Sequence, residues 1–196
     1  MENKQSVHNL KIILVEPSGP LNVGSVARLC SNFNVDELRI VSPNCDIYSS
    51  DSKRMAMKGI SYINNCIVYK NLINALSDCD LVLATYGRIS LAKEESPFSL
   101  QEASKWINNF KKIQNLAIVF GREDRGLTND ELLLAQKVFT IETQNNPSLN
   151  LSHAVSIVLY ELSKNVNLKN TKFKKDLNLA NSMQIESTFF DLNKLL

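Results

Sequence analysis

The sequence predicts one α/β domain with a mostly parallel, six-stranded sheet and helices on both faces of it. Short apolar, β-branched segments alternate along the chain with segments of helical periodicity, the order that parallel sheets require. Pro, Gly, Asn or Asp bounds each apolar segment. With 196 residues, of which 44% are hydrophobic, the chain is large enough to bury one substantial core.

Six segments have the composition of buried strands, and each is short enough to be one strand rather than a helix. In chain order they are "LKIILVE" (10–16), "ELRIVSP" (37–43), "CIVYK" (66–70), "DLVLATYG" (80–87), "LAIVFG" (116–121) and "KVFTIET" (137–143).

Helical segments lie between and after these strands. The clearest spans 149–165, where apolar residues recur at helical spacing from Leu151 to Leu162. Thr128 and Glu131 form a capping box, since each side chain can satisfy a free backbone N–H group, and predict a helix over "NDELLLAQ". The segment "NVGSVAR" (22–28) opens a further helix, with Asn22 as its candidate cap.

The composition of the chain changes only near the C-terminus, and several classes of protein are excluded by patterns that the sequence lacks. We expect a domain over 1–163 and a basic, Asn/Lys-rich tail over 164–196 with room for one helix. The apolar stretch "LKIILV" is far shorter than the ~20 residues of a membrane span, and no signal-peptide pattern follows it. Neither the four cysteines nor the two histidines have metal-site spacing. We therefore expect a cytoplasmic protein with reduced thiols and no metal.

Three polar, glycine-bearing segments follow predicted strands, at the sheet edge where α/β proteins bind ligands. They are "EPSGPLNVGSVARLCSNF" (16–33), "FGREDRGLTNDEL" (120–132) and "PSLNLSHAVSIVLYEL" (147–162). Gly121 can let main-chain N–H groups approach a ligand closely. Ser148 and Asn150 can cap the last helix or present polar groups to an adenine or a carboxylate. Taken singly, each of these residues is better explained as part of a turn or as a helix cap.

Together, and in this order and spacing, the three segments resemble the motifs of the SpoU-type RNA ribose 2′-O-methyltransferases of the SPOUT superfamily. The resemblance covers roughly 10–163. It is strongest to the branch that methylates the pyrimidine ribose at nucleotide 32, the start of the tRNA anticodon loop. It implies S-adenosylmethionine as the cofactor and a deep trefoil knot near the C-terminal end of the fold. Knots are almost absent from proteins, so the periodicity alone could not predict one.

The resemblance also implies which residues bind the methyl donor. Three loops at the carboxyl ends of neighbouring strands would hold it, mostly by backbone contacts. Where the family usually has Ile-Pro, this chain has Ile141-Glu142, and the segment up to Ser148 is about one residue shorter. The donor-binding residues implied are Thr85, Tyr86, Gly87, Gly121, Arg122, Glu123, Ile141, Ser148, Leu149 and Asn150.

For the reaction itself, the resemblance places Arg28 beside the target ribose, with Asn22 and Ser148 near the reacting groups. Arg28 would stabilise the alkoxide that forms as the 2′-hydroxyl loses its proton. A neutral arginine is scarce at pH 7, so an RNA phosphate or water is an equally plausible proton acceptor. We expect a homodimer in which Arg28 of one subunit faces the cofactor pocket of the other. The RNA-binding residues expected are Arg28, Arg88, Lys169, Lys172, Lys174 and Lys175.

Other functions remain open at this point. A nicotinamide-binding oxidoreductase shares the α/β alternation, but "EPSGPLNVGS" lacks the G-x-G-x-x-G spacing of that class. A non-catalytic RNA-binding protein on the same scaffold is harder to exclude, because fold does not determine function. The substrate could also be rRNA. The net charge is only +2, so any nucleic-acid site must be a local patch.

Overall fold

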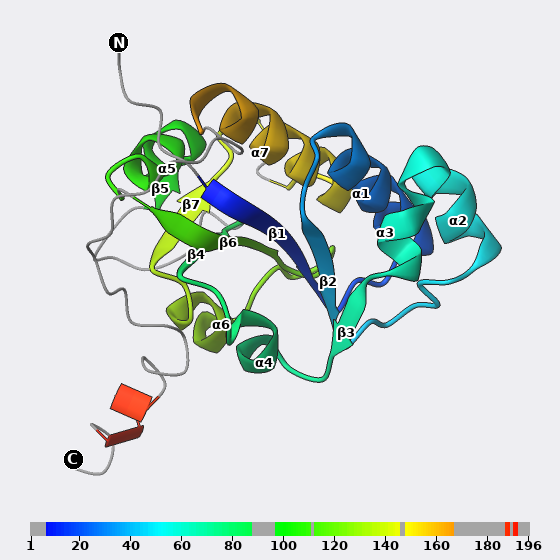
Figure 1. Ribbon diagram of the computed structural model, residues 1–196, viewed down its shortest axis with the longest axis horizontal. Helices are drawn as coiled ribbons and strands as arrows, with labels where there is room; N and C mark the ends of the chain where they lie inside the picture. The colour runs from blue at the N-terminus through cyan, green and yellow to red at the C-terminus, as the bar shows by residue number, and fades with distance from the viewer. Residues whose placement is uncertain are drawn as a thin grey trace.

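A single parallel sheet organises the part of the chain that the computed structural model describes: residues 7–87, 97–110, 112–145, 148–166, 187–188 and 190–191. Its seven strands have the order β3-β2-β1-β6-β4-β7-β5, and each neighbouring pair is parallel (Figure 1). The strands are β1 (Val7–Val15), β2 (Glu37–Val41), β3 (Ile67–Tyr69), β4 (Leu81–Thr85), β5 (Phe98–Ser99), β6 (Ile113–Phe120) and β7 (Lys137–Thr140).

The six predicted strands are all present, but the predicted number of strands is wrong. The structure adds β5, which pairs with β7 at the edge of the sheet. Two residues are too few to show the alternation by which a strand is recognised in a sequence. The last predicted strand, 137–143, ends at Thr140, because the following residues belong to a loop at the sheet edge.

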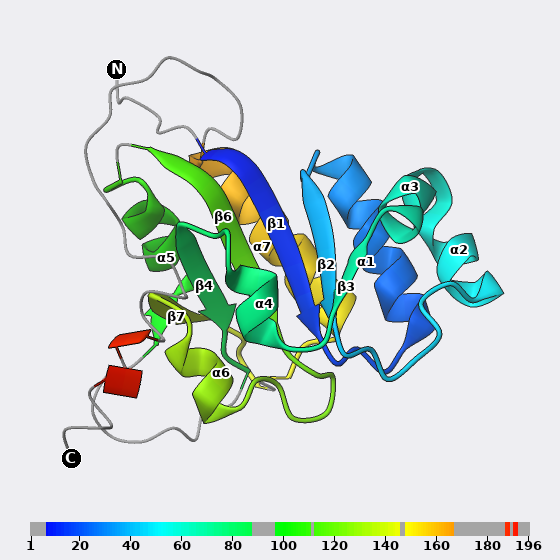
Figure 2. The ribbon, with the colours of Figure 1, turned by 60° about the horizontal axis from the view of Figure 1, so that its bottom comes forward.

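Helices cover both faces of the sheet, as predicted. α1, α5 and α7 lie on one face, and α4 and α6 lie on the other (Figures 1 and 2). The side chains of β1 alternate accordingly: Leu10, Ile12 and Leu14 join the core under the first group, while Ile13 and Val15 join the core under the second. The helices are α1 (Pro20–Asn32), α2 (Ser50–Ala56), the 3₁₀ helix η1 (Met57–Gly59), α3 (Ile60–Asn64), α4 (Leu72–Leu76), α5 (Leu100–Ile107), α6 (Asn129–Leu133) and α7 (Leu151–Asn165).

The two helices predicted in the C-terminal half of the domain are both present, but one of them is shorter than predicted. α7 lies within the predicted segment 149–165. Thr128 and Glu131 form the predicted capping box of α6. However, α6 ends at Leu133 rather than continuing through "NDELLLAQ", because the chain must turn to enter β7 at Lys137.

Two glycines let α1 pack unusually close to α2 and η1. A Cβ atom on Gly24 would lie 2.2 Å from the carbonyl oxygen of Ser52. A Cβ atom on Gly59 would lie 2.3 Å from the carbonyl oxygen of Ala27 and 2.8 Å from the Cα atom of Arg28. Any larger residue at either position would push the backbones apart, so these glycines set the spacing between the helices.

None of the described helices has the length and apolar character needed to cross a membrane. The domain packing continues as far as Val166, which is buried in the core. Arg88 and the lysines from Lys169 to Lys175 lie outside the described residues. The division into a domain over 1–163 and a tail over 164–196 therefore stays a prediction.

Candidate functional site

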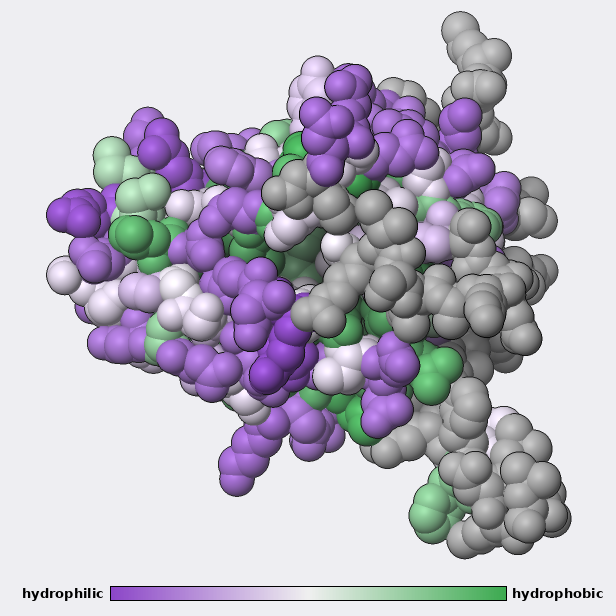
Figure 3. All heavy atoms as spheres, turned by 180° about the vertical axis from the view of Figure 1, so that it is seen from behind, coloured by the Kyte–Doolittle hydropathy of each residue, from purple (hydrophilic) through white to green (hydrophobic). Residues whose placement is uncertain are grey.

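The loops that follow β4, β6 and β7 meet around one cavity of about 360 Å³ at the carboxyl edge of the sheet. Figure 3 shows this face of the molecule, which is hollowed near its centre. Every residue that the sequence predicted to bind the donor lines this cavity, except Asn150. The lining residues are Thr85, Tyr86, Gly87, Phe120, Gly121, Arg122, Glu123, Asp124, Arg125, Gly126, Ile141, Ser148, Leu149, Leu151 and Ala154.

The loop after β6 is tight because of its two glycines. Arg122 and Gly126 exchange backbone hydrogen bonds of 3.3 and 3.0 Å, which close the loop. A Cβ atom on Gly121 would lie only 2.3 Å from the carbonyl carbon of Gly126. Gly126 itself has φ of +71°, a conformation that glycine adopts without strain. A backbone this close to the cavity can present its polar groups directly to a ligand.

Arg122 anchors this loop through two carboxylates. Its guanidinium donates to Glu16 at 2.7 and 2.6 Å and to Glu131 at 2.9 and 2.9 Å, and it is nearly buried. These hydrogen bonds raise the pKa of Arg122 and lower that of Glu16. Burial raises the pKa of Glu131, but the hydrogen bonds from Arg122 and Thr128 and the charge of Arg122 together bring the pKa below its usual range. The charge of Arg122 is thus used to join β1, the loop and α6.

Glu123 takes the place of a capping residue at the start of α1. Its carboxylate accepts hydrogen bonds from the backbone N–H of Ser18 (3.1 Å) and Gly19 (3.2 Å), and from the side chains of Ser18 (3.0 Å) and Asn22 (3.0 Å). Burial raises the pKa of Glu123, yet these donors bring it below its ordinary value. The anion-binding end of α1 is therefore already filled by a carboxylate of the same chain.

The prediction that Asn22 caps α1 is wrong. Pro20 begins the helix two residues earlier, and Gly19 stands at the N-cap without a side-chain bond. Proline suits the first helical position because its φ is already helical and it has no N–H group to leave unpaired. Asn22 instead lies in the first turn, where its side chain can reach the neighbouring loops.

Asn150 is confirmed as the cap of α7 and connects it to α1. Its side-chain oxygen accepts from the backbone N–H of Ser152 (2.9 Å) and His153 (3.4 Å), and its Nδ2 donates to Oδ1 of Asn22 at 3.0 Å. Since Asn22 donates in turn to Glu123, one chain of hydrogen bonds joins the three sequence motifs. Ser148 does not cap the helix but lines the cavity.

Arg28 is not brought to the cavity of its own chain. It lies on the exposed side of α1, about 9 Å along the helix from Asn22, and makes no hydrogen bond or ion pair with a described residue. Its guanidinium is therefore available to another molecule.

Residues 9–160 match the model of the SpoU rRNA Methylase family. The chain belongs to this family. The match covers nearly all of the described domain, including every loop around the cavity, and confirms the family predicted from the three motifs.

Relatives within the SpoU family include named enzymes. The chain is 36% identical over 160 residues to the tRNA (cytidine-2′-O-)-methyltransferase TrmJ of Sulfolobus acidocaldarius, covering 80% of this chain and 66% of that protein. It is 35% identical over 164 residues to the tRNA (cytidine/uridine-2′-O-)-methyltransferase TrmJ of Sodalis glossinidius, covering 80% of this chain and 61% of that one. The chain thus spans slightly less than two thirds of the length of these relatives.

Solved structures of the family agree with the fold. TrmJ from Z. mobilis ZM4 superposes with a TM-score of 0.78 at 27% identity, covering 97% of this chain and 80% of that one. A structure solved to study 2-OH methylation of C/U34 on tRNA gives a TM-score of 0.65 at 25% identity, covering 81% of this chain and 96% of that one.

Sequence reasoning missed part of the SpoU cavity. The residues overlooked are of two kinds: those inside the second motif, and those on the first turn of α7. The first kind had a signal, since "FGREDRGL" is one continuous loop in which the predicted residues are immediate neighbours. The second had none, because Leu151 and Ala154 look like ordinary core positions of a helix. The overlooked residues are Phe120, Asp124, Arg125, Gly126, Leu151 and Ala154.

In the described part of the chain, no group of three or more His, Cys, Asp or Glu side chains is arranged to hold a metal.

Proposed function

We propose that this protein transfers a methyl group from S-adenosylmethionine to a ribose 2′-hydroxyl of tRNA, at nucleotide 32 of the anticodon loop. One observation carries the proposal: the second and third SpoU motifs line a single cavity, and the hydrogen-bond chain Asn150–Asn22–Glu123 joins the first motif to both of them. The choice of tRNA rests on the similarity to the TrmJ enzymes.

The cavity suits the proposed donor in size and chemistry. Its volume falls within the range of small-molecule sites. Ile141, Leu149 and Leu151 supply apolar surface for an adenine ring, and the backbone around Gly87 and Gly121 can approach the ligand closely. When bound, S-adenosylmethionine supplies a methyl group already activated by the sulfonium charge. We assign donor binding to the predicted residues that line the cavity, with Asn150 holding the start of α7 beside them.

The protein's contribution to the reaction is positioning and charge stabilisation. Arg28 orients the ribose and stabilises the negative charge that develops on the 2′-oxygen. Ser148, at the cavity wall, and Asn22, at the end of the hydrogen-bond chain, hold the reacting groups in place. The proton passes to an RNA phosphate or to water, because a guanidinium donates hydrogen bonds and has no acceptor atom. Arg88 and the lysines from Lys169 to Lys175 bind RNA phosphates in this proposal.

A homodimer would complete the proposed active site. Because Arg28 does not reach the cavity of its own chain, the partner subunit would supply it. Large apolar side chains on the outer surfaces of α1 and α7 support it: Leu21, Ile157 and Tyr160 are 48%, 39% and 55% exposed. Buried in an isologous interface, they would bring two copies of α1 together. Sedimentation at micromolar concentration should give twice the 22.1 kDa chain mass. A fully active monomer would contradict the proposal.

We extend the proposal to the trefoil knot of the superfamily. The segment from Ile141 to Asn150 would be threaded through the loops that follow β4 and β6, with which it shares the cavity. A chain whose termini are joined after folding would then stay knotted in denaturant. It should elute from gel filtration in urea as a more compact species than a chain joined while unfolded.

Methylation of three RNAs by one preparation tests the substrate. Whole tRNA should be the best acceptor, an isolated anticodon stem-loop weaker, and a ribosomal RNA fragment inactive, because folded RNA shape is expected to dominate recognition. Mass spectrometry of the product should place the methyl group at nucleotide 32. Modification at nucleotide 34, or a preference for the ribosomal fragment, would refute the substrate and leave the chemistry standing. Tight donor binding without transfer to any RNA would favour the non-catalytic alternative.

A further inference from the structure

Four exposed cations lie together on α1, α2 and η1, outside the cavity. Lys53 and Arg54 come from α2 and Lys58 from η1, and together with Arg28 of α1 we call them the α2–η1 patch. Among the described residues, Lys53, Lys58 and Arg28 have no ion-pair partner. Arg54 pairs with Asp51 at 2.9 Å, but its side chain is still 73% exposed.

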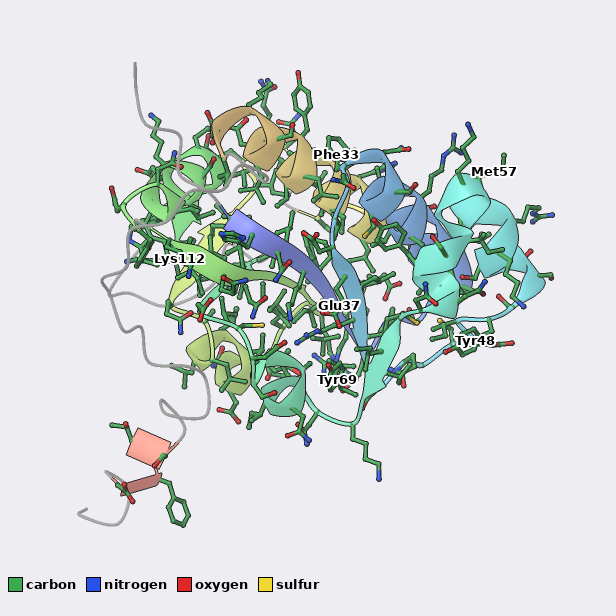
Figure 4. All side chains as sticks on the ribbon, in the orientation of Figure 1. Phe33, Glu37, Tyr48, Met57, Tyr69 and Lys112 are labelled. Atoms are coloured by element: carbon green, nitrogen blue, oxygen red, sulfur yellow. The ribbon has the colours of Figure 1, made fainter. Side chains whose placement is uncertain are left out.

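Packing rather than sequence neighbourhood assembles the patch. Gly59 sits directly against the backbone of Ala27 and Arg28, so the adjacent Lys58 is held beside the helix that carries Arg28. Gly24 holds the other end of α2 against α1 in the same way. Figure 4 shows Met57 at the outer edge of this segment, directed away from the sheet. The four cations are all exposed and belong to elements that are in direct backbone contact.

The patch has a larger net positive charge than the whole chain. Its four cations and the one carboxylate of Asp51 leave three positive charges, against a formal net charge of +2 for the whole chain. The end of α1, which could otherwise bind a phosphate, is occupied by Glu123. An anionic partner that reaches Arg28 would thus find further exposed cations on α2 and η1, the elements that pack against α1.

We infer that the α2–η1 patch binds the phosphate backbone of the tRNA substrate on one side of the target nucleotide. This inference rests on the proposed function, because the patch includes Arg28, which is proposed to contact the ribose. Lysines on an exposed helix provide charge without base-specific geometry, so the patch positions the RNA and does not select its sequence. Its contribution should be electrostatic and strongly salt-dependent.

The test compares two double variants with the same loss of charge. Lys53→Gln/Lys58→Gln removes two patch cations, and Lys70→Gln/Lys105→Gln removes two exposed lysines elsewhere. The patch variant should raise KM for tRNA at least about fivefold, and reduce the slope of log Kd against log salt by about 1–2, as expected for two lost phosphate contacts. Its kcat at saturating tRNA and its donor affinity should match those of the wild type. Lys53→Arg/Lys58→Arg, which keeps both charges, should bind tRNA with the affinity of the wild type.

Three outcomes would overturn the inference: an unchanged salt slope, equal weakening by both double variants, or loss of binding to anionic lipid vesicles with tRNA binding intact. Direct titration with tRNA keeps this test separate from that of the proposed function. A wild-type protein that binds tRNA through the patch but methylates no RNA would refute the reaction and retain the patch. If the wild type methylates tRNA and the patch variant binds tRNA as tightly as the wild type, the reaction stands and the patch is refuted.

Discussion

Replacing Arg28 by alanine is expected to lower kcat for methyl transfer by at least about 10²–10³-fold, the usual effect of removing one donor to a developing oxyanion. Affinity for S-adenosylmethionine should hardly change, since in the proposed site Arg28 contacts the ribose of the RNA and its contacts strengthen only as the alkoxide forms. Folding should also be unaffected, because the side chain is exposed and alanine favours a helix. Lys105→Ala, on the exposed surface of α5, is the control. Lost donor binding with unchanged kcat would show that the role assigned to Arg28 is wrong.

Mixing two inactive variants tests whether Arg28 acts across subunits. Gly121→Val should close the donor site, because a side chain there collides with the backbone at Gly126. In a heterodimer of Arg28→Ala and Gly121→Val, one site combines an intact cavity with an intact Arg28 from the partner. Activity should therefore return when the two preparations are dissociated and reassociated. A mixture that stays inactive, although heterodimers have formed, would place Arg28 and its cavity in the same subunit.

The second large effect is expected at Asp78, on the other side of the molecule from the cavity-lining loops. Lys11 and Arg39 are buried, at 5% and 3% exposure, and are neutralised by Asp78 and Glu37. Arg39 donates to Asp78 at 2.6 and 2.9 Å and lies 5.4 Å from the centre of the Tyr69 ring. Figure 4 labels Glu37, at the start of β2, and Tyr69, at the end of the neighbouring strand β3. Removing one carboxylate leaves two buried cations with a single partner.

Asp78→Asn should lower the free energy of unfolding by about 2–3 kcal/mol. This is less than the cost of breaking a fully buried pair, since Glu37 remains and the Asp78 side chain is 50% exposed. Asp51→Asn, which breaks the exposed pair with Arg54, should cost about 0.5 kcal/mol or less. Urea unfolding of both variants measures the difference. Equal losses would mean that the buried network adds nothing beyond a surface ion pair.

The same network predicts the sign of a pH effect. Hydrogen bonds from Arg39 hold the pKa of Asp78 well below its ordinary value of 3.8. A carboxyl group with a lowered pKa stabilises the folded state fully above its unfolded pKa, and this contribution declines as the pH falls towards the folded pKa. The stability difference between wild type and Asp78→Asn should therefore be constant near pH 7 and narrow below about pH 4.

Most of the fold and most of the cavity lining could be predicted because the evidence for them is local. Buried parallel strands are continuous apolar segments, and the three motifs follow strands whose carboxyl ends must meet at one edge of the sheet. That geometry brings Thr85, Gly121 and Ser148 to one cavity. Strand β5 escaped prediction because two residues carry no periodicity, and α6 is shorter than its pattern because β7 follows at once.

The sequence by itself determined the α/β class, the loops that form the cavity and membership of the SpoU family, because each depends on residues close together in the chain. Only the tertiary structure decided how those loops are held. Glu16 and Glu131 are 115 residues apart and share Arg122, while Asn22 turned out to link Glu123 with Asn150 rather than to cap a helix. The α2–η1 patch likewise exists because Gly24 and Gly59 permit two helices to touch. Such contacts depend on the distance between backbones that are remote in sequence, which no local pattern records.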